Sequence, residues 1–151
     1  MLKKLIILTI FYFFTSASQA DQFKFKKIAS LAKPWGSSFI SETEIIISEK
    51  IGKIKIVNIN DGKIIDVQHN LKFKNVGQGG LLDIIYKDKY VWISYTEELE
   101  KRIYATSIAR GKLNKKKIKF KNIFQSIPND INTDFHFGSR LAIDGDYLFA
   151  S

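Results

Sequence analysis

The sequence predicts an all-β fold. Three observations predict it: short β-branched runs, lysines that alternate with apolar residues, and turn signals at a spacing of roughly ten residues. No segment after the first twenty residues has the period of an amphipathic helix. Such spacing is typical of a β-sandwich, a β-barrel or the blades of a propeller. A weak repeat of strand, polar turn and strand, at residues 39–55 and 140–151, favours blades.

The expected strands follow one another along the chain. Residues 44–48 (EIIIS) are a β-branched run. Residues 52–58 alternate lysine with apolar side chains, which is typical of a strand with one solvent-exposed face. The NDG segment at residues 60–62 is a tight-turn signal, after which residues 63–67 return as the next strand. Further strands are expected at residues 81–86, 90–95, 103–109, 117–124 and 147–151.

Two polar loops stand out between these strands, at residues 69–80 and 125–138. Long polar loops on a rigid β scaffold are where binding and catalytic sites usually lie. Gln78 and His136 stand at the ends of these loops, just before a strand resumes. His69 lies in a polar turn, and we expect it to be solvated.

The N-terminus has the pattern of a secretory signal peptide over residues 1–20. Lys3 and Lys4 precede a short apolar run, and the SQA segment at residues 18–20 is a small-x-small cleavage signature. The run is too short to span a bilayer comfortably, which disfavours the alternative of an uncleaved anchor. We therefore expect a periplasmic or secreted mature protein, residues 21–151, without a membrane span.

The composition excludes some classes of site. The chain has no cysteine, which excludes disulfides and thiolate metal sites. Its formal net charge is +9, carried mostly by scattered lysines. This charge could attract anionic surfaces or an acidic electron-transfer partner. Alternatively, it could reflect an AT-rich coding bias that favours lysine at surface positions. A nucleic-acid partner is not expected, because such a patch normally carries more arginine with interleaved aromatic residues.

Two segments each place a polar side chain among glycines: GQGGLLD at residues 77–83 and HFGSRL at residues 136–141. Four other segments resemble segments of a known family and occur in the same order along the chain: PWGSSF at residues 34–39, SEKIGKI at 48–54, YVWISY at 90–95 and ARGKL at 109–113. Together they resemble the soluble sugar dehydrogenases that use pyrroloquinoline quinone (PQQ), of the glucose/sorbosone dehydrogenase type. The resemblance covers residues 33–151.

This resemblance implies a six-bladed β-propeller, of which the chain would hold about the first two blades. In the family, PQQ lies across the central opening with calcium beside its carboxylates. The activity implied is oxidation of aldose sugars at the anomeric carbon to lactones, with electrons passing on to a quinone, a dye or a cytochrome. The family's arginine that polarises the quinone, and its calcium ligands, would lie beyond Ser151, so no metal-binding residue is assigned within this fragment.

Two site residues follow from the resemblance. His136 matches the general base, and Gln78 matches a glutamine that contacts sugar and cofactor. The residue types suit this chemistry, since imidazole is partly neutral near pH 7 and can take the hydroxyl proton while hydride goes to PQQ. A glutamine amide both donates and accepts, and can therefore orient a hydroxyl without adding charge.

One departure from the family pattern bears on substrate choice. Some members carry a sugar-holding aspartate before the base, whereas this chain has Phe135 there, with Asp134 one position earlier. The departure indicates the less selective branch, the aldose sugar dehydrogenases. Phe135 and Phe137, on either side of His136, could wall an apolar pocket or could reflect alternate burial around the start of a strand. Arg140 could bind an anionic ligand or brace loops between blades, and Asp83 is expected to hold a loop rather than act as a base.

Two other functions stay open at this point. One is a non-catalytic propeller that binds sugars or cell-wall material, sharing the scaffold without the base. The other is a calcium-dependent lactonase on a similar propeller, which would need acidic ligands near the central axis. Glu49 is the only early candidate for such a ligand.

Overall fold

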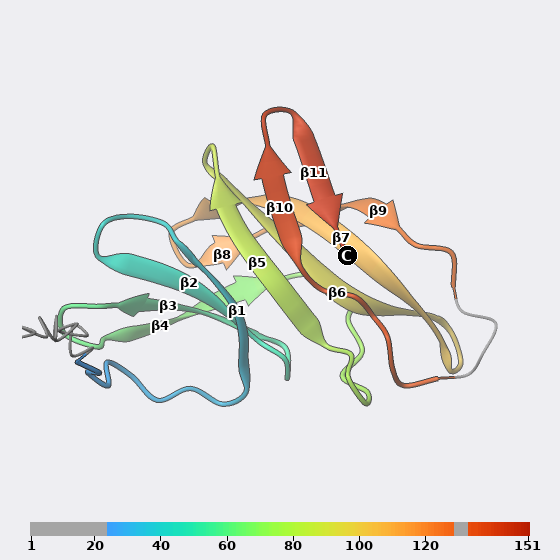
Figure 1. The fold of residues 1–151 in the computed structure, drawn as a ribbon, viewed down its shortest axis with the longest axis horizontal. Helices are drawn as coiled ribbons and strands as arrows, with labels where there is room; N and C mark the ends of the chain where they lie inside the picture. The colour runs from blue at the N-terminus through green and yellow to red at the C-terminus, as the bar shows by residue number, and fades with distance from the viewer. Residues whose placement is uncertain (1–23, 129–132) are drawn as a thin grey trace, which may run out of the picture.

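The computed structural model describes residues 24–128 and 133–151, and the predicted signal peptide lies outside them. All regular secondary structure in the described residues is β, which confirms the predicted class (Figure 1). The eleven strands are β1 (Pro34–Phe39), β2 (Glu44–Glu49), β3 (Lys53–Asn58), β4 (Ile64–His69), β5 (Leu81–Lys87), β6 (Tyr90–Glu100), β7 (Ile103–Asn114), β8 (Lys117–Ile118), β9 (Lys121–Gln125), β10 (Leu141–Asp144) and β11 (Tyr147–Ala150). Within the described residues, no helix is long and apolar enough to cross a membrane.

The strands form two antiparallel groups and a separate hairpin. Strands β1 to β4 pair in sequence order, and β5, β6, β7 and β9 form the second group. The short strand β8 pairs with β7 and, in parallel, with β4, and thereby joins the two groups. Strands β10 and β11 form the hairpin, and β10 lies beside β5 (Figure 1). Groups of consecutive antiparallel strands of this kind are the blades of a propeller.

Alternation of side chains explains the strands and the core. On β3, Ile54 and Ile56 are buried, whereas Lys53 between the turn and the first isoleucine is exposed. Strand β5 is buried on both faces from Leu81 to Ile84, because the first group covers one side. Each large apolar side chain that is fully buried contributes about 1.5–3 kcal/mol. The main core cluster comprises Ile46, Ile54, Ile56, Val67, Leu81, Ile84, Val91, Ile93, Tyr95, Ala109, Ile118 and Phe120.

Two strand predictions differ from the structure. Strand β1 was not expected, and it forms because its backbone pairs with β2. The single strand expected at residues 117–124 is divided into β8 and β9. Asn70 explains the break: its amide donates to the Phe120 carbonyl at 3.1 Å and accepts from the Phe120 N–H at 2.7 Å. The backbone of Phe120 is therefore paired with a side chain instead of a strand.

Strand β5 begins near the lower edge of the view in Figure 1, and the segment that leads into β10 runs up from the same edge. We call this the site end, and it comprises the loops at residues 70–80 and 133–140 and the β2–β3 turn at residues 50–52. Strands β1, β5 and β10 are neighbours, and Gly36 on β1 lies against β5. A Cβ atom at Gly36 would lie 2.7 Å from the Ile84 backbone nitrogen, so only glycine permits this approach.

Candidate functional site

The site end brings together the two residues that the sequence singled out. The backbone N–H of His136 donates to Oε1 of Gln78 at 3.1 Å, across 58 positions of sequence. The backbone N–H of Gln78 donates in turn to the Asp134 carbonyl at 2.8 Å. Both side chains are exposed. The two loops are therefore tied to each other by reciprocal hydrogen bonds, with Gln78 and His136 side by side at the surface.

Glycine at position 77 is required for this contact. Its φ is 47°, in the left-handed region, and a Cβ atom would lie 2.2 Å from the Asp134 carbonyl oxygen. Gln78 follows with its amide oxygen already engaged by His136. Gln78 is exposed and its NH2 group makes no hydrogen bond among the described residues, so this donor is available to a ligand oxygen.

The conformation of His136 is fixed by its neighbours. Its φ is 64°, which is uncommon for a residue with a side chain. Phe137, the next residue, is buried and packs edge-on against Tyr104, with ring centroids 6.0 Å apart. The Thr106 hydroxyl donates to the Phe137 carbonyl. Because Phe137 is anchored in this way, the backbone beside the exposed His136 is fixed in place.

Phe135 takes the opposite position to Phe137. It is exposed, and its ring centroid lies 6.5 Å from that of His136. A cavity of about 400 Å³ adjoins this segment, and its lining includes Tyr104, Phe137 and His136. Neither Phe135 nor Gln78 lines this cavity. The two phenylalanines therefore alternate between surface and interior on either side of the histidine.

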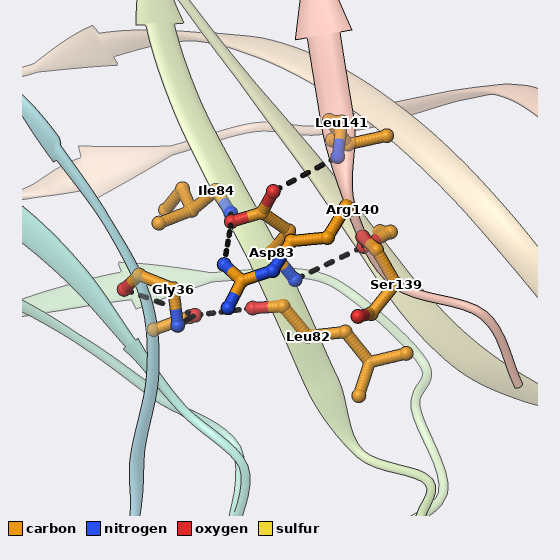
Figure 2. Close-up of polar contacts among 9 residues, drawn as sticks. Gly36, Leu82, Asp83, Ile84, Ser139, Arg140 and Leu141 are labelled. Carbon is orange, nitrogen blue, oxygen red and sulfur yellow. Dashed lines mark hydrogen bonds and ion pairs between the residues drawn. The ribbon is translucent and has the colours of Figure 1, made fainter. Parts of the chain in front are cut away.

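Asp83 joins the strands behind the site (Figure 2). Its buried carboxylate accepts from the backbone N–H of Leu141 at 2.9 Å and from that of Ile84 at 3.0 Å. Arg140 approaches the same carboxylate at 3.5 Å, with its side chain largely exposed. Asp83 therefore ties β5 to the start of β10, as expected for a loop-holding carboxylate, and Arg140 lies over this junction.

Serine hydroxyls, which the sequence did not single out, complete the junction. Ser94 accepts from the Asp83 N–H at 3.0 Å and donates to the Ser139 carbonyl at 2.6 Å. Ser48 accepts from the Gly36 N–H at 3.0 Å and donates to the Leu82 carbonyl. Both serines are buried on strands, where a small polar residue among apolar neighbours is the only sign of such a role.

The prediction that His69 is solvated is wrong. The residue ends β4 and is half-buried, with its Nε2 atom 3.0 Å from the Gly52 carbonyl. Its Nδ1 atom accepts from the backbone N–H of Leu71 at 3.3 Å. The imidazole therefore bridges the β2–β3 turn and the residues after β4, since both of its nitrogens find backbone partners there.

The described residues offer no acidic cluster for a metal ion. No group of three or more His, Cys, Asp or Glu side chains comes together in the parts of the chain that the structure describes. Glu49 is fully buried, and its Oε1 atom accepts from the Ala32 N–H at 2.6 Å. Its Oε2 atom has no hydrogen-bond partner among these residues.

An ion pair ties the loop before β5 to strand β6. Lys74 Nζ lies 2.8 Å from a carboxylate oxygen of Glu98. This hydrogen bond and the lysine charge lower the pKa of Glu98, and the same hydrogen bond raises the pKa of Lys74. The pair is exposed, so its contribution to stability is small, and its effect is to keep the loop along the sheet.

Comparison with known proteins is consistent with this geometry. A family model described as Glucose / Sorbosone dehydrogenase matches residues 31–151. A crystal structure of a glucose dehydrogenase is 27% identical, with a TM-score of 0.72, and the match covers 80% of this chain and 38% of that one. No curated protein sequence matches significantly.

Two aldose sugar dehydrogenases show the same fold. The soluble enzyme from Escherichia coli, solved in its apo form, is 27% identical with a TM-score of 0.72, again over 80% of this chain and 38% of that one. The PQQ-bound form of the enzyme from Streptomyces coelicolor is 22% identical with a TM-score of 0.66, over 77% of this chain and 36% of that one. The chain thus spans well under half the length of these structures.

Proposed function

The chain belongs to the glucose/sorbosone dehydrogenase family, and on this basis we propose that it serves PQQ-dependent oxidation of an aldose. The reaction would take place at the anomeric carbon and give a lactone. The proposal covers the activity of the whole protein, because the chain spans 38% of the length of the dehydrogenases it matches. We further propose a periplasmic or secreted location, on the strength of the signal-peptide pattern at residues 1–20.

One observation carries the proposal: Gln78 and His136 lie side by side at the exposed site end, linked through the His136 N–H. A ring nitrogen of His136 would accept the proton of the anomeric hydroxyl. The Gln78 NH2 group would donate to an oxygen of sugar or cofactor, because its own oxygen is already engaged. Each residue thus has a distinct role: one takes a proton and the other orients an oxygen.

The residues present fit part of the cofactor assembly. PQQ, when bound, supplies the quinone that accepts the hydride. The exposed Gln78 NH2 group is the group of this chain that would hold it. Calcium has no ligand set among the described residues, so we assign it no residue and no step.

The surroundings of His136 favour broad acceptance of aldoses. Phe135 stands beside it with an exposed aromatic ring, where a carboxylate would bind sugar hydroxyls selectively. An aromatic face contacts the apolar face of many sugars with little discrimination. We propose the aldose sugar dehydrogenase type of specificity on this ground, with a quinone, a dye or a cytochrome as electron acceptor.

The test is dye reduction by the protein expressed from its own gene, with PQQ and calcium added. We expect reduction on addition of an aldose, formation of the corresponding lactone, and no reduction with a sugar alcohol that lacks an anomeric carbon. Omission of PQQ should abolish the signal. Saturable binding of sugar without any dye reduction would contradict the proposal and favour the non-catalytic sugar-binding propeller.

A further inference from the structure

We propose that Lys50, in the β2–β3 turn, is a positioning residue for the candidate site. The role rests on the proposed function, because the residue it positions is the candidate base. The Nζ atom of Lys50 donates to the Gly77 carbonyl and lies 3.5 Å from the Asn75 side-chain oxygen. Lys50 thereby reaches from the first group of strands to the loop that enters the second.

Lys50 also holds the far end of the same loop. Its backbone carbonyl accepts from the Leu81 N–H at 3.2 Å. Gly80 packs against it so closely that a Cβ atom there would lie 2.2 Å from the Lys50 carbonyl oxygen. The segment between Gly77 and Leu81 is therefore bound to one residue at both ends, by the side chain at its start and by the main chain at its finish.

The contact continues from this loop to His136. Gly77 lies against Asp134, and the Gln78 N–H donates to the Asp134 carbonyl at 2.8 Å. The Gln78 oxygen then accepts from the His136 N–H at 3.1 Å. Moving Gly77 would displace both of these hydrogen bonds, so the Lys50 ammonium acts on His136 through the glycine loop, without touching the imidazole.

Lys50 is itself well fixed. Its backbone N–H donates to the Lys33 carbonyl at 3.0 Å, and its side chain is half-buried. Glu49, immediately before it, is fully buried. An ammonium group that bonds two oxygens from a rigid turn makes charge-assisted hydrogen bonds, which are the stronger kind. Loss of the ammonium alone should therefore loosen the loop while leaving the turn intact.

Hydrogen exchange, read by mass spectrometry on peptides covering residues 74–80 and 133–140, tests the proposal. In Lys50→Met, which keeps the apolar stem, we expect both peptides to exchange about tenfold faster, since one hydrogen bond is lost. Lys50→Gln should do the same. Lys50→Arg, which keeps a charged donor, should restore the rate to within about twofold of the unsubstituted protein.

Lys53→Met is the matched control, at the start of β3 directly after this turn. Lys53 is exposed, and among the described residues its side chain makes no hydrogen bond or ion pair. We expect no change in either peptide. Faster exchange in Lys53→Met, an unchanged 133–140 peptide in Lys50→Met, or uniformly faster exchange in every strand would each overturn the positioning role.

The exchange readout needs neither sugar nor cofactor, so it separates this proposal from the proposed function. The Lys50 variants could change hydrogen exchange as expected while the protein oxidises no aldose. That result would contradict the enzyme proposal and still support the positioning role of Lys50. Aldose oxidation with unchanged exchange would contradict the positioning alone. In an active protein, Lys50→Met should lower kcat more than it raises KM, and Lys50→Arg should recover most of kcat.

Discussion

The inner and outer sides of the sheets differ in how far their residues are buried. We call the place where β1, β5 and β10 meet the inner junction; there Gly36, Asp83 and Leu141 are all buried. We call strands β9 and β11 the outer edge. Every residue of β9 is exposed, and on β11 Tyr147 is 73% and Phe149 56% exposed. The candidate site belongs to the inner side, because its loops lead into β5 and β10.

The difference between the inner junction and the outer edge shows which contacts fix the strands that carry the candidate site. At the inner junction the strands are joined by a glycine contact, two buried serines and one carboxylate, each with a defined partner. At the outer edge apolar side chains lie in solvent without such partners. Specific polar contacts therefore fix the relative position of the strands, and apolar area alone does not. Substitutions on the two sides should have very different costs.

The largest effect is expected at Asp83. Asp83→Ala would leave the buried N–H groups of Leu141 and Ile84 without an acceptor, at a cost of about 3 kcal/mol of unfolding free energy. Urea unfolding measures this. The control is Asp66→Ala, which removes a surface ion pair with Lys55 and should have a much smaller effect. Equal costs for the two would contradict the difference between buried junction and surface.

A second effect, in strongly alkaline solution, is expected at Tyr95 on β6, beside the start of β5. Burial, and then the Glu97 charge, raise the pKa of Tyr95 to about 12, from 10.0. A raised pKa contributes stability that is present below the unfolded pKa and lost as pH rises through the folded one. The loss should approach about 2–3 kcal/mol near pH 12.

Tyr95→Phe tests this, because it removes the titrating hydroxyl. Urea unfolding at about pH 9 and about pH 11 should show a smaller pH-dependent loss in the variant than in the unsubstituted protein. An identical loss in both would mean that the Tyr95 hydroxyl does not have the raised pKa of a buried group, and would contradict the description of the inner side as buried.

The smallest effect on stability is expected at the outer edge. Phe124→Ser and Phe149→Ser replace exposed aromatic residues and should change the unfolding free energy by about 0.5 kcal/mol or less. For a protein of these 151 residues, both should reduce self-association, since exposed apolar patches promote it. Sedimentation velocity measures the change. A large loss of stability in either variant would show that the outer edge is packed.

The class of fold and most strands could be predicted from the sequence because apolar alternation reports burial locally. Strand β1 could not, since Pro34 and Gly36 have loop-like composition and the strand depends on pairing with β2. The break at Phe120 depends on Asn70, 50 positions away. Such long-range side-chain contacts leave no local pattern for a periodicity argument to use.

The candidate site shows the same limit. Glycines beside Gln78 and His136 marked both loops, and the resemblance suggested roles for both residues. The contact between the Gln78 oxygen and the His136 N–H, and the reach of Lys50 to Gly77, follow only from the packing of loops that are distant in sequence. The roles themselves stay predictions until they are measured.

The most direct test of the central claim, that the site end carries the base for aldose oxidation, is kcat/KM for His136→Gln beside His69→Gln, in protein expressed from its own gene with PQQ and calcium. His69 is the matched control, since it is a half-buried histidine whose ring bonds the backbone of Gly52 and Leu71 and, among the described residues, makes no hydrogen bond with Gln78 or His136. We predict a loss of about 10²–10⁴-fold for His136→Gln and at most a few-fold for His69→Gln. Activity that survives His136→Gln, or falls equally in both variants, would contradict the account.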